Sequence, residues 1–237
     1  MENSMGTTVN LKASDGFEFP VYVAQPSGRP KGALVVLQEI FGVNSHIRSL
    51  ADGFAADGYL AVAPATFHRS QPGVELGYTA EDIGTGRALK TAIEALPAPG
   101  VLADIEASID YARKALGGGG KVGVVGYCWG GLLAWRAACL LRGVACAVPY
   151  YGGGVTLSPE KERKPRCPVM AHFGDKDQNI PIEGVQAFAQ AQGSALVQVH
   201  VYEADHGFSC DQRGSYDAAA SRLARDRTLT FFASHIG

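Results

Sequence analysis

The segment Gly126–Gly131, which reads GYCWGG, constrains the fold of this chain more than any other feature. One apolar run, at 121–125, precedes it, and another, at 132–135, follows it. A strand, a tight turn flanked by glycines and a helix form a nucleophile elbow, G-x-S-x-G, here with Cys128 in the serine position. Such a turn presents the side chain at its apex to substrate. The N-terminus of the following helix favours a thiolate and a developing oxyanion.

Two other interpretations of this segment stay open. Cysteine is often a small buried hydrophobe, and glycine-rich turns between a strand and a helix also bind phosphate groups. A dinucleotide-binding turn needs an acidic residue near the end of the next strand, about 20 residues further on. The next apolar run, 144–150, reads VACAVPY and contains none. The nucleophile elbow is therefore favoured.

A nucleophile requires a base, and the base requires an orienting carboxylate. With this kind of elbow the chain order is nucleophile, acid, histidine. Asp175 and Asp177 both follow a predicted strand at 167–174, and the spacing from the strand end favours Asp177. His206 lies in a loop after the predicted strand 196–202, where an imidazole is accessible. His172 lies inside an apolar strand and is expected to be a hydrogen-bonded core residue.

The loop after an early buried strand completes the predicted site. The strand at 33–37 leads into residues 38–44, which read QEIFGVN. This loop supplies one oxyanion-hole N–H in such folds, and the residue after the nucleophile supplies the other. The backbone amides of Ile40 and Trp129 are therefore the candidates. Glu39 places a carboxylate among apolar neighbours at the rim of the site, although an ordinary solvated loop glutamate is the alternative.

With these segments in hand, the chain resembles the dienelactone hydrolase (carboxymethylenebutenolidase) family. The matching motifs are QEIFGVN at 38–44, GYCWGG at 126–131, GDKD at 174–177 and ADHGF at 204–208, and the resemblance extends from about residue 9 to residue 232. It implies an α/β-hydrolase fold and a triad of Cys128, His206 and Asp177. It also implies that Glu39 contacts the thiol in the resting enzyme and helps to take the thiol proton when substrate binds.

The resemblance further implies hydrolysis of an activated enol lactone, from dienelactone to maleylacetate, through a thioester. The catabolic enzymes of the family bind the substrate carboxylate with two arginines, and the corresponding positions here are Cys210 and Gly84. A carboxylesterase or lactonase acting on a different activated ester is therefore the alternative. Other residues that could line the substrate pocket are Arg69, Arg87, Arg213, Tyr78 and Phe41.

Composition limits the remaining possibilities. A chain of 237 residues with 46% hydrophobic content is expected to form a single domain over residues 1–237. The net charge of −2, without a basic run, argues against nucleic-acid and membrane partners. No apolar stretch approaches about 18 residues, and residues 1–8 show no leader pattern. Five widely spaced cysteines argue against a disulfide framework and favour the cytoplasm.

The expected ligand is a small lactone or ester, bound by a monomer or small homo-oligomer. No histidine pair has the spacing of a metal motif, so neither a metal nor another cofactor is expected. Two other function classes are alternatives to hydrolysis. One is a binding or redox protein that keeps the scaffold, and the other is a nucleotide-binding protein.

Apolar strands and helical segments alternate along the chain, which predicts a doubly wound, mainly parallel sheet with helices on both faces. The long loop at 64–79 is expected either to line a site or to be an ordinary surface excursion. The other elements expected are an entry hairpin (8–11 and 17–23), a strand at 60–63, and helices at 46–57, 80–95, 102–116 and 215–235.

Overall fold

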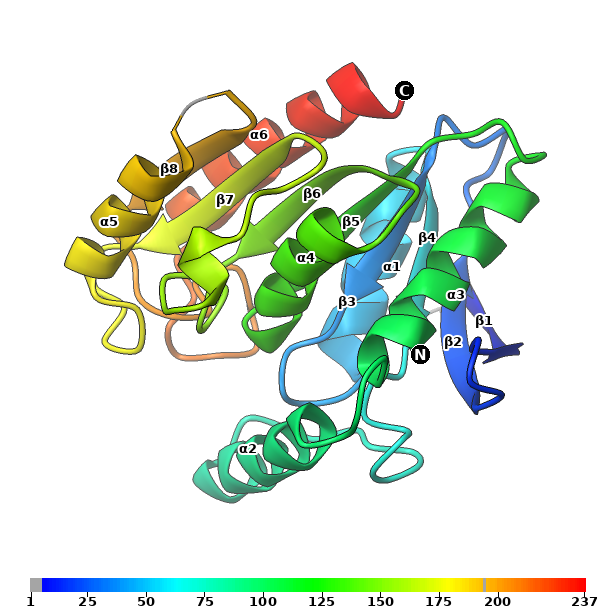
Figure 1. Ribbon diagram of the computed structural model, residues 1–237, viewed down its shortest axis with the longest axis horizontal. Helices are drawn as coiled ribbons and strands as arrows, with labels where there is room; N and C mark the ends of the chain where they lie inside the picture. Colours follow the sequence, from blue (N-terminus) through cyan, green and yellow to red (C-terminus); the bar gives the residue numbers. More distant parts are fainter. Residues whose placement is uncertain (1–5, 194) are drawn as a thin grey trace.

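The computed structural model describes residues 6–193 and 195–237. The expectation of no leader pattern concerns residues 1–8, and the first five of these lie outside the described residues. Eight strands form one sheet in the order β1-β2-β4-β3-β5-β6-β7-β8 (Figure 1). The strands are β1 (Gly6–Lys12), β2 (Glu18–Ala24), β3 (Ala33–Leu37), β4 (Leu60–Pro64), β5 (Val122–Tyr127), β6 (Val144–Tyr150), β7 (Val169–Gly174) and β8 (Val197–Tyr202). The helices are α1 (Ser45–Ala56), α2 (Ala80–Glu94), α3 (Val101–Ala115), α4 (Trp129–Leu140), the 3-10 turn η1 (Glu160–Glu162), α5 (Ile182–Gln192) and α6 (Ala218–His235).

The sheet is mainly parallel, as the alternating pattern predicts. β1 pairs antiparallel with β2, and β2 with β4, whereas the strands from β4 to β8 pair in parallel. Parallel strands are stable when both faces are covered, and every residue of β3, β4 and β5 is buried. α3 and α4 cover one face, and α1 and α6 cover the other (Figure 1). The chain therefore has the α/β-hydrolase fold.

The helix boundaries follow from local capping. α2 begins where the sequence predicts, because Thr79 and Asp82 form a reciprocal capping box. The last helix begins at Ala218, later than the expected residue 215, because Asp217 is its N-cap and accepts hydrogen bonds from two backbone N–H groups of the first turn. His172 is a buried core residue with both ring nitrogens hydrogen-bonded, to Tyr202 and Thr228.

The carboxyl ends of the parallel strands lie at one edge of the sheet, where ligands bind in such folds. α2 lies beyond this edge and belongs to neither helix layer (Figure 1). Gly86 allows α2 to approach the loop after β3, because a Cβ there would lie 2.1 Å from the carbonyl oxygen of Ile40. This contact fixes the Ile40 backbone beside the elbow.

The elbow between β5 and α4 has a strained apex and closely packed flanks. Cys128 has φ 54° and ψ −115°, a backbone conformation that residues other than glycine rarely adopt. A Cβ on Gly126 would lie 1.9 Å from the carbonyl oxygen of Gly130, and one on Gly130 would lie 2.4 Å from the carbonyl oxygens of Leu37 and Gln38. The flanking glycines are therefore a steric requirement of the turn.

We expect Gly126→Ala to lower the free energy of unfolding by about 3 kcal/mol, because the added methyl group overlaps a backbone carbonyl that cannot move freely. Gly84→Ala is the matched control. It places the same methyl group on the exposed side of α2, with no atom within 4 Å, and should raise the stability by about 1 kcal/mol through helix propensity. Urea unfolding measures both, and equal effects of the two substitutions would contradict the packing argument.

Candidate active site

Cys128, His206 and Asp177 meet at the carboxyl edge of the sheet. Cys128 precedes α4, Asp177 follows β7 and His206 follows β8. His206 Nε2 lies 3.1 Å from the Cys128 sulfur, and His206 Nδ1 lies 2.6 Å from Asp177 Oδ2. The imidazole thus lies between a thiol and a carboxylate, the geometry of a nucleophile, a base and an orienting group.

Asp177, and not Asp175, reaches the histidine. Asp177 is buried, and its other carboxylate oxygen accepts a hydrogen bond of 2.8 Å from the backbone N–H of Asn179. Asp175 is exposed, and its backbone N–H donates to the carbonyl of Tyr202. Of the two aspartates that follow the strand, Asp177 is therefore the one in contact with His206.

Electrostatic interactions within this group favour a charged imidazole. Burial lowers the pKa of His206. The negative charge on Cys128 and the hydrogen bond to Asp177 together have the larger effect and raise this pKa to about 10. The ring of Tyr151 packs edge-on against the imidazole, with centroids 5.2 Å apart. The imidazolium is therefore the form of His206 that this environment stabilises at neutral pH.

Glu39 is fully buried beside this pair. Its Oε1 accepts a hydrogen bond of 3.3 Å from Arg213, and its Oε2 has no hydrogen-bond partner. The family resemblance implies a resting contact between Glu39 and the thiol. In this structure the hydrogen-bond partner of Glu39 is Arg213, and the partner of the thiol is His206.

A cavity of about 190 Å³ opens onto the thiol and the imidazole. Ile40 and Trp129, whose backbone amides are the predicted oxyanion donors, both line it. The Trp129 indole donates a hydrogen bond of 3.2 Å to Glu94 and stacks on Phe67, which anchors the start of α4. The remaining lining residues are Phe41, Ile83, Arg87, Lys90, Cys128, Gly153, Asn179, His206 and Arg213.

Three cations surround this cavity. Arg87 and Arg213 line it, and each lies three residues after one of the positions, Gly84 and Cys210, where the family resemblance implies an arginine. Lys90 is a third cation that the sequence analysis missed, and its ammonium group pairs with Glu94 at 2.7 Å. The sequence does contain a pattern that indicates this position. Lys90 follows Arg87 by three residues on the same predicted helix, and residues three apart share a helix face.

Two other candidates for the substrate pocket lie outside its lining. The guanidinium of Arg69 pairs with Asp15 and Asp104, at 2.7 Å each, so it is held away from the cavity. Tyr78 packs edge-on against Phe41, with ring centroids 4.6 Å apart. Tyr78 therefore supports a wall residue from behind.

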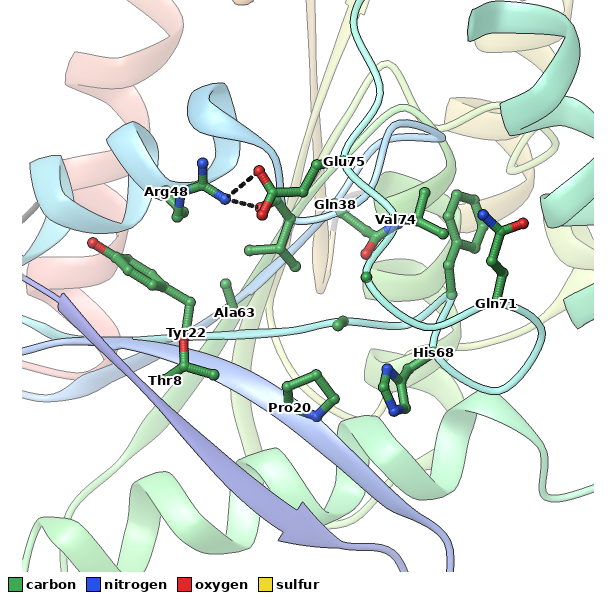
Figure 2. Close-up of a pocket in the computed structure, with 14 residues that line it drawn as sticks. Thr8, Pro20, Tyr22, Gln38, Arg48, Ala63, His68, Gln71, Val74 and Glu75 are labelled. Carbon is green, nitrogen blue, oxygen red and sulfur yellow. Dashed lines mark hydrogen bonds and ion pairs between the residues drawn. The ribbon is translucent and has the colours of Figure 1, made fainter.

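A second cavity, of about 230 Å³, lies between the loop at 64–79 and the antiparallel edge of the sheet (Figure 2). An ion pair of 2.8 Å between Arg48 and Glu75 closes one side of it. Neither the thiol nor the imidazole of the candidate site lines this cavity. The long loop therefore lines this second cavity, whereas Cys128 and His206 line the smaller one.

In the part of the chain that the structure describes, no helix has the length and apolarity needed to cross a membrane.

Comparison with known proteins gives consistent matches over almost the full chain. The model of the dienelactone hydrolase family matches residues 19–236. The carboxymethylenebutenolidase of Pseudomonas putida is 36% identical over 231 residues, which covers 95% of each chain. A solved Klebsiella pneumoniae structure, described as a dienelactone hydrolase, superimposes with a TM-score of 0.79 at 29% identity and covers 97% of this chain and 99% of the other. An esterase of Pyrococcus furiosus, at 15% identity and a TM-score of 0.71, covers 98% of this chain and 93% of its own and shares the fold. The chain belongs to the dienelactone hydrolase family.

Proposed function

We propose that this protein opens an activated enol lactone of the dienelactone type, with Cys128 as nucleophile, His206 as base and Asp177 as orienting group. The alignment of sulfur, imidazole and carboxylate, with contacts of 3.1 and 2.6 Å, carries the proposal. Membership of a family of ester and lactone hydrolases supports it.

The reaction has two halves. The Cys128 thiolate attacks the lactone carbonyl, and the backbone N–H groups of Ile40 and Trp129 stabilise the tetrahedral oxyanion. Collapse of this intermediate breaks the ring C–O bond, leaving a thioester on sulfur and an enolate that takes the proton of the His206 imidazolium. His206, held by Asp177, then removes a proton from water as it attacks the thioester, which releases the acid and regenerates the thiolate.

A cysteine nucleophile suits this class of substrate. A thiolate that attacks an ordinary ester tends to be expelled again, because an alkoxide is the poorer leaving group. An enolate leaves far more readily, so the intermediate proceeds to the thioester. When Glu39 faces Cys128 it takes the thiol proton and leaves the thiolate ready for attack, whereas in this structure its partner is Arg213.

The substrate carries a carboxylate that binds between Arg87 and Arg213. Arginine holds carboxylates through charge-assisted hydrogen bonds, and both residues line the cavity that Cys128 also lines. A carboxylesterase or lactonase acting on another activated ester is the second candidate. The glycine and cysteine at the family's arginine positions, Gly84 and Cys210, favour it.

A reducing compartment fits this chemistry. All five cysteines are free thiols, and a reactive thiolate is prone to oxidation. We therefore place the protein in the cytoplasm, as a monomer or small homo-oligomer that takes small lactones or esters.

Cys128→Ala should reduce hydrolysis of cis- and trans-dienelactone and of p-nitrophenyl acetate by at least ~10³-fold, because no other group replaces the nucleophile. Thermal unfolding of the variant should stay close to that of the wild type, since alanine keeps the backbone of the elbow. Full activity in this variant would exclude the proposal. Turnover of the simple ester alone by the wild type would favour the second candidate.

Asp177→Asn should lower the pKa of His206 from about 10, because the carboxylate that stabilises the imidazolium is lost. Cys128→Ala should lower it as well, since the thiolate is the larger cause of the upward shift. The imidazole resonances in an NMR titration report both changes. An unchanged pKa in the two variants would show that the contacts of His206 do not control its charge.

Arg87→Gln should raise the KM for dienelactone about tenfold, which corresponds to about 1.4 kcal/mol, and leave the KM for neutral p-nitrophenyl acetate unchanged. The expected selectivity arises because only the lactone carries a carboxylate. Arg222→Gln, on the exposed side of α6, is the matched control and should change neither constant. An equal loss with both substrates would argue for a structural role of Arg87.

A further inference from the structure

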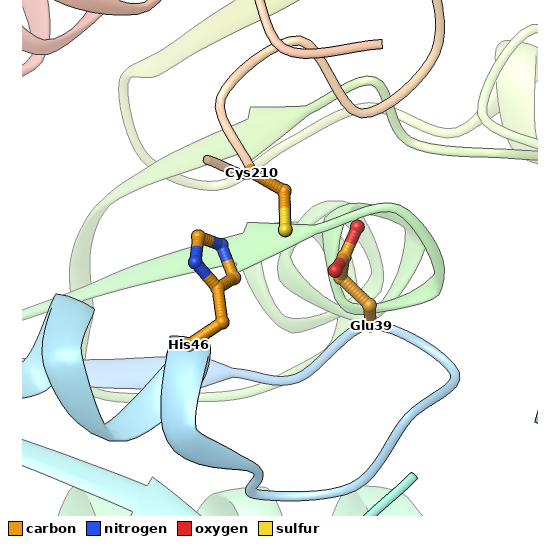
Figure 3. A group of neighbouring side chains, drawn as sticks. All are labelled: Glu39, His46 and Cys210. Atoms are coloured by element: carbon orange, nitrogen blue, oxygen red, sulfur yellow. The ribbon is translucent and has the colours of Figure 1, made fainter. Parts of the chain in front are cut away.

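Glu39, His46 and Cys210 converge behind the active site from the loop after β3, the start of α1 and the loop after β8 (Figure 3). One ligand atom of each lies within 4.8 Å of the others, and the three residues are 1%, 3% and 0% exposed. From this geometry we infer that the three side chains form a binding site for a Zn²⁺ ion.

Two of the three groups present polar atoms that lack a hydrogen-bond partner. His46 Nε2 and Glu39 Oε2 are both buried and unpaired. A buried polar atom without a partner is costly and uncommon. In Figure 3 the imidazole, the sulfur and the carboxylate point toward one another. A cation between them would satisfy both unpaired atoms at once.

The types of donor select the metal. Nitrogen, sulfur and oxygen ligands together suit Zn²⁺, which binds them at about 2.0 to 2.3 Å in tetrahedral geometry. Ligand atoms around such an ion lie about 3.5 Å apart, so the present separations need a contraction of about 1 Å. Mg²⁺ and Ca²⁺ prefer oxygen ligands, which disfavours them here. Three protein ligands leave a fourth position for water.

The surroundings of His46 match those of a metal-binding histidine. Its Nδ1 lies 3.4 Å from a carboxylate oxygen of Asp211. Zinc-bound histidines generally donate the second ring N–H to a carboxylate, which fixes the tautomer and aims the other nitrogen at the metal. Burial lowers the pKa of His46, although Glu39 and Asp211 oppose this effect. The imidazole is therefore neutral, and its free nitrogen can bind a cation.

The other groups that face this cluster set the cost of binding. Burial and the charge of Glu39 raise the pKa of Cys210 to about 11, so its thiol is protonated before metal enters and binding releases this proton. Tyr78 hydrogen-bonds to the same thiol. The guanidinium of Arg213, which donates a hydrogen bond to the other oxygen of Glu39, opposes the incoming charge. Entry is from the active-site cavity, which Arg213 lines.

Zinc at this position also inhibits hydrolysis, if Glu39 takes the thiol proton as proposed above. A carboxylate bound to the metal cannot accept a proton from Cys128. Only this consequence depends on the proposed function. Metal binding is measured separately from hydrolysis, so failure of the metal-binding proposal does not imply failure of the proposed hydrolase activity, or the reverse.

The test uses Co²⁺ as a spectroscopic substitute for Zn²⁺ in the Cys128→Ala protein, which removes the competing thiol–imidazole pair of the active site. One equivalent should produce a thiolate-to-cobalt charge-transfer band, and Zn²⁺ should displace it. The band should disappear when Cys210→Ser is added, and Co²⁺ affinity should fall at least tenfold with His46→Gln. Cys139→Ser, which alters a buried thiol outside the cluster, is the matched control and should keep the band.

Two outcomes would overturn the inference. The first is the absence of a charge-transfer band in the folded Cys128→Ala protein, an observation that requires no other substitution. The second is a band that persists in the Cys128→Ala protein with Cys210→Ser. Near-ultraviolet circular dichroism confirms that each variant is folded. Release of one proton per zinc ion, measured with a pH indicator in weakly buffered solution, is an independent sign that Cys210 binds as thiolate.

Discussion

The close backbone contact between the elbow and the end of β3 is the constraint on which the rest of the site depends. Gly130 packs so tightly against the carbonyls of Leu37 and Gln38 that no side chain fits between them. This contact places Cys128 directly beside the loop that carries Glu39 and Ile40. Cys128, the Glu39 carboxylate and one predicted oxyanion donor therefore share one junction of two neighbouring parallel strands.

The charged groups around this junction are arranged in pairs. The His206 imidazole lies between the Cys128 sulfur and the Asp177 carboxylate, and the carboxylate compensates a charged imidazole. Each charge thus has a partner in a region where an unpaired charge would be costly. Arg213 plays the corresponding part for Glu39. The site therefore combines two partly buried ion pairs, His206 with Asp177 and Arg213 with Glu39.

Glu39 is the side chain at which the proposed activities meet. Its carboxylate pairs with Arg213 through one oxygen. The other oxygen has no hydrogen-bond partner and belongs to the cluster with His46 and Cys210. The same carboxylate cannot serve as proton acceptor and metal ligand at one time. Competition for this one group is a physical basis for control of the thiol by a metal ion.

The sequence by itself determined the elements and the order of the candidate site. Strand and helix patterns are local, because they follow from the spacing of apolar residues and from capping groups such as Thr79. The elbow motif and the chain order of Cys128, Asp177 and His206 likewise need no three-dimensional information beyond a parallel sheet. Parallel pairing brings all strand ends to one edge, so the residues that follow those strands had to lie close together.

Only the tertiary structure decided which partners the long side chains contact and which cavity each loop lines. Arg69 pairs with Asp15 and Asp104, and Lys90 joins the cavity wall. The cluster of Glu39, His46 and Cys210 draws on distant segments with no motif spacing. Such contacts depend on loop paths and on competition among partners, which the periodicity of a sequence does not encode.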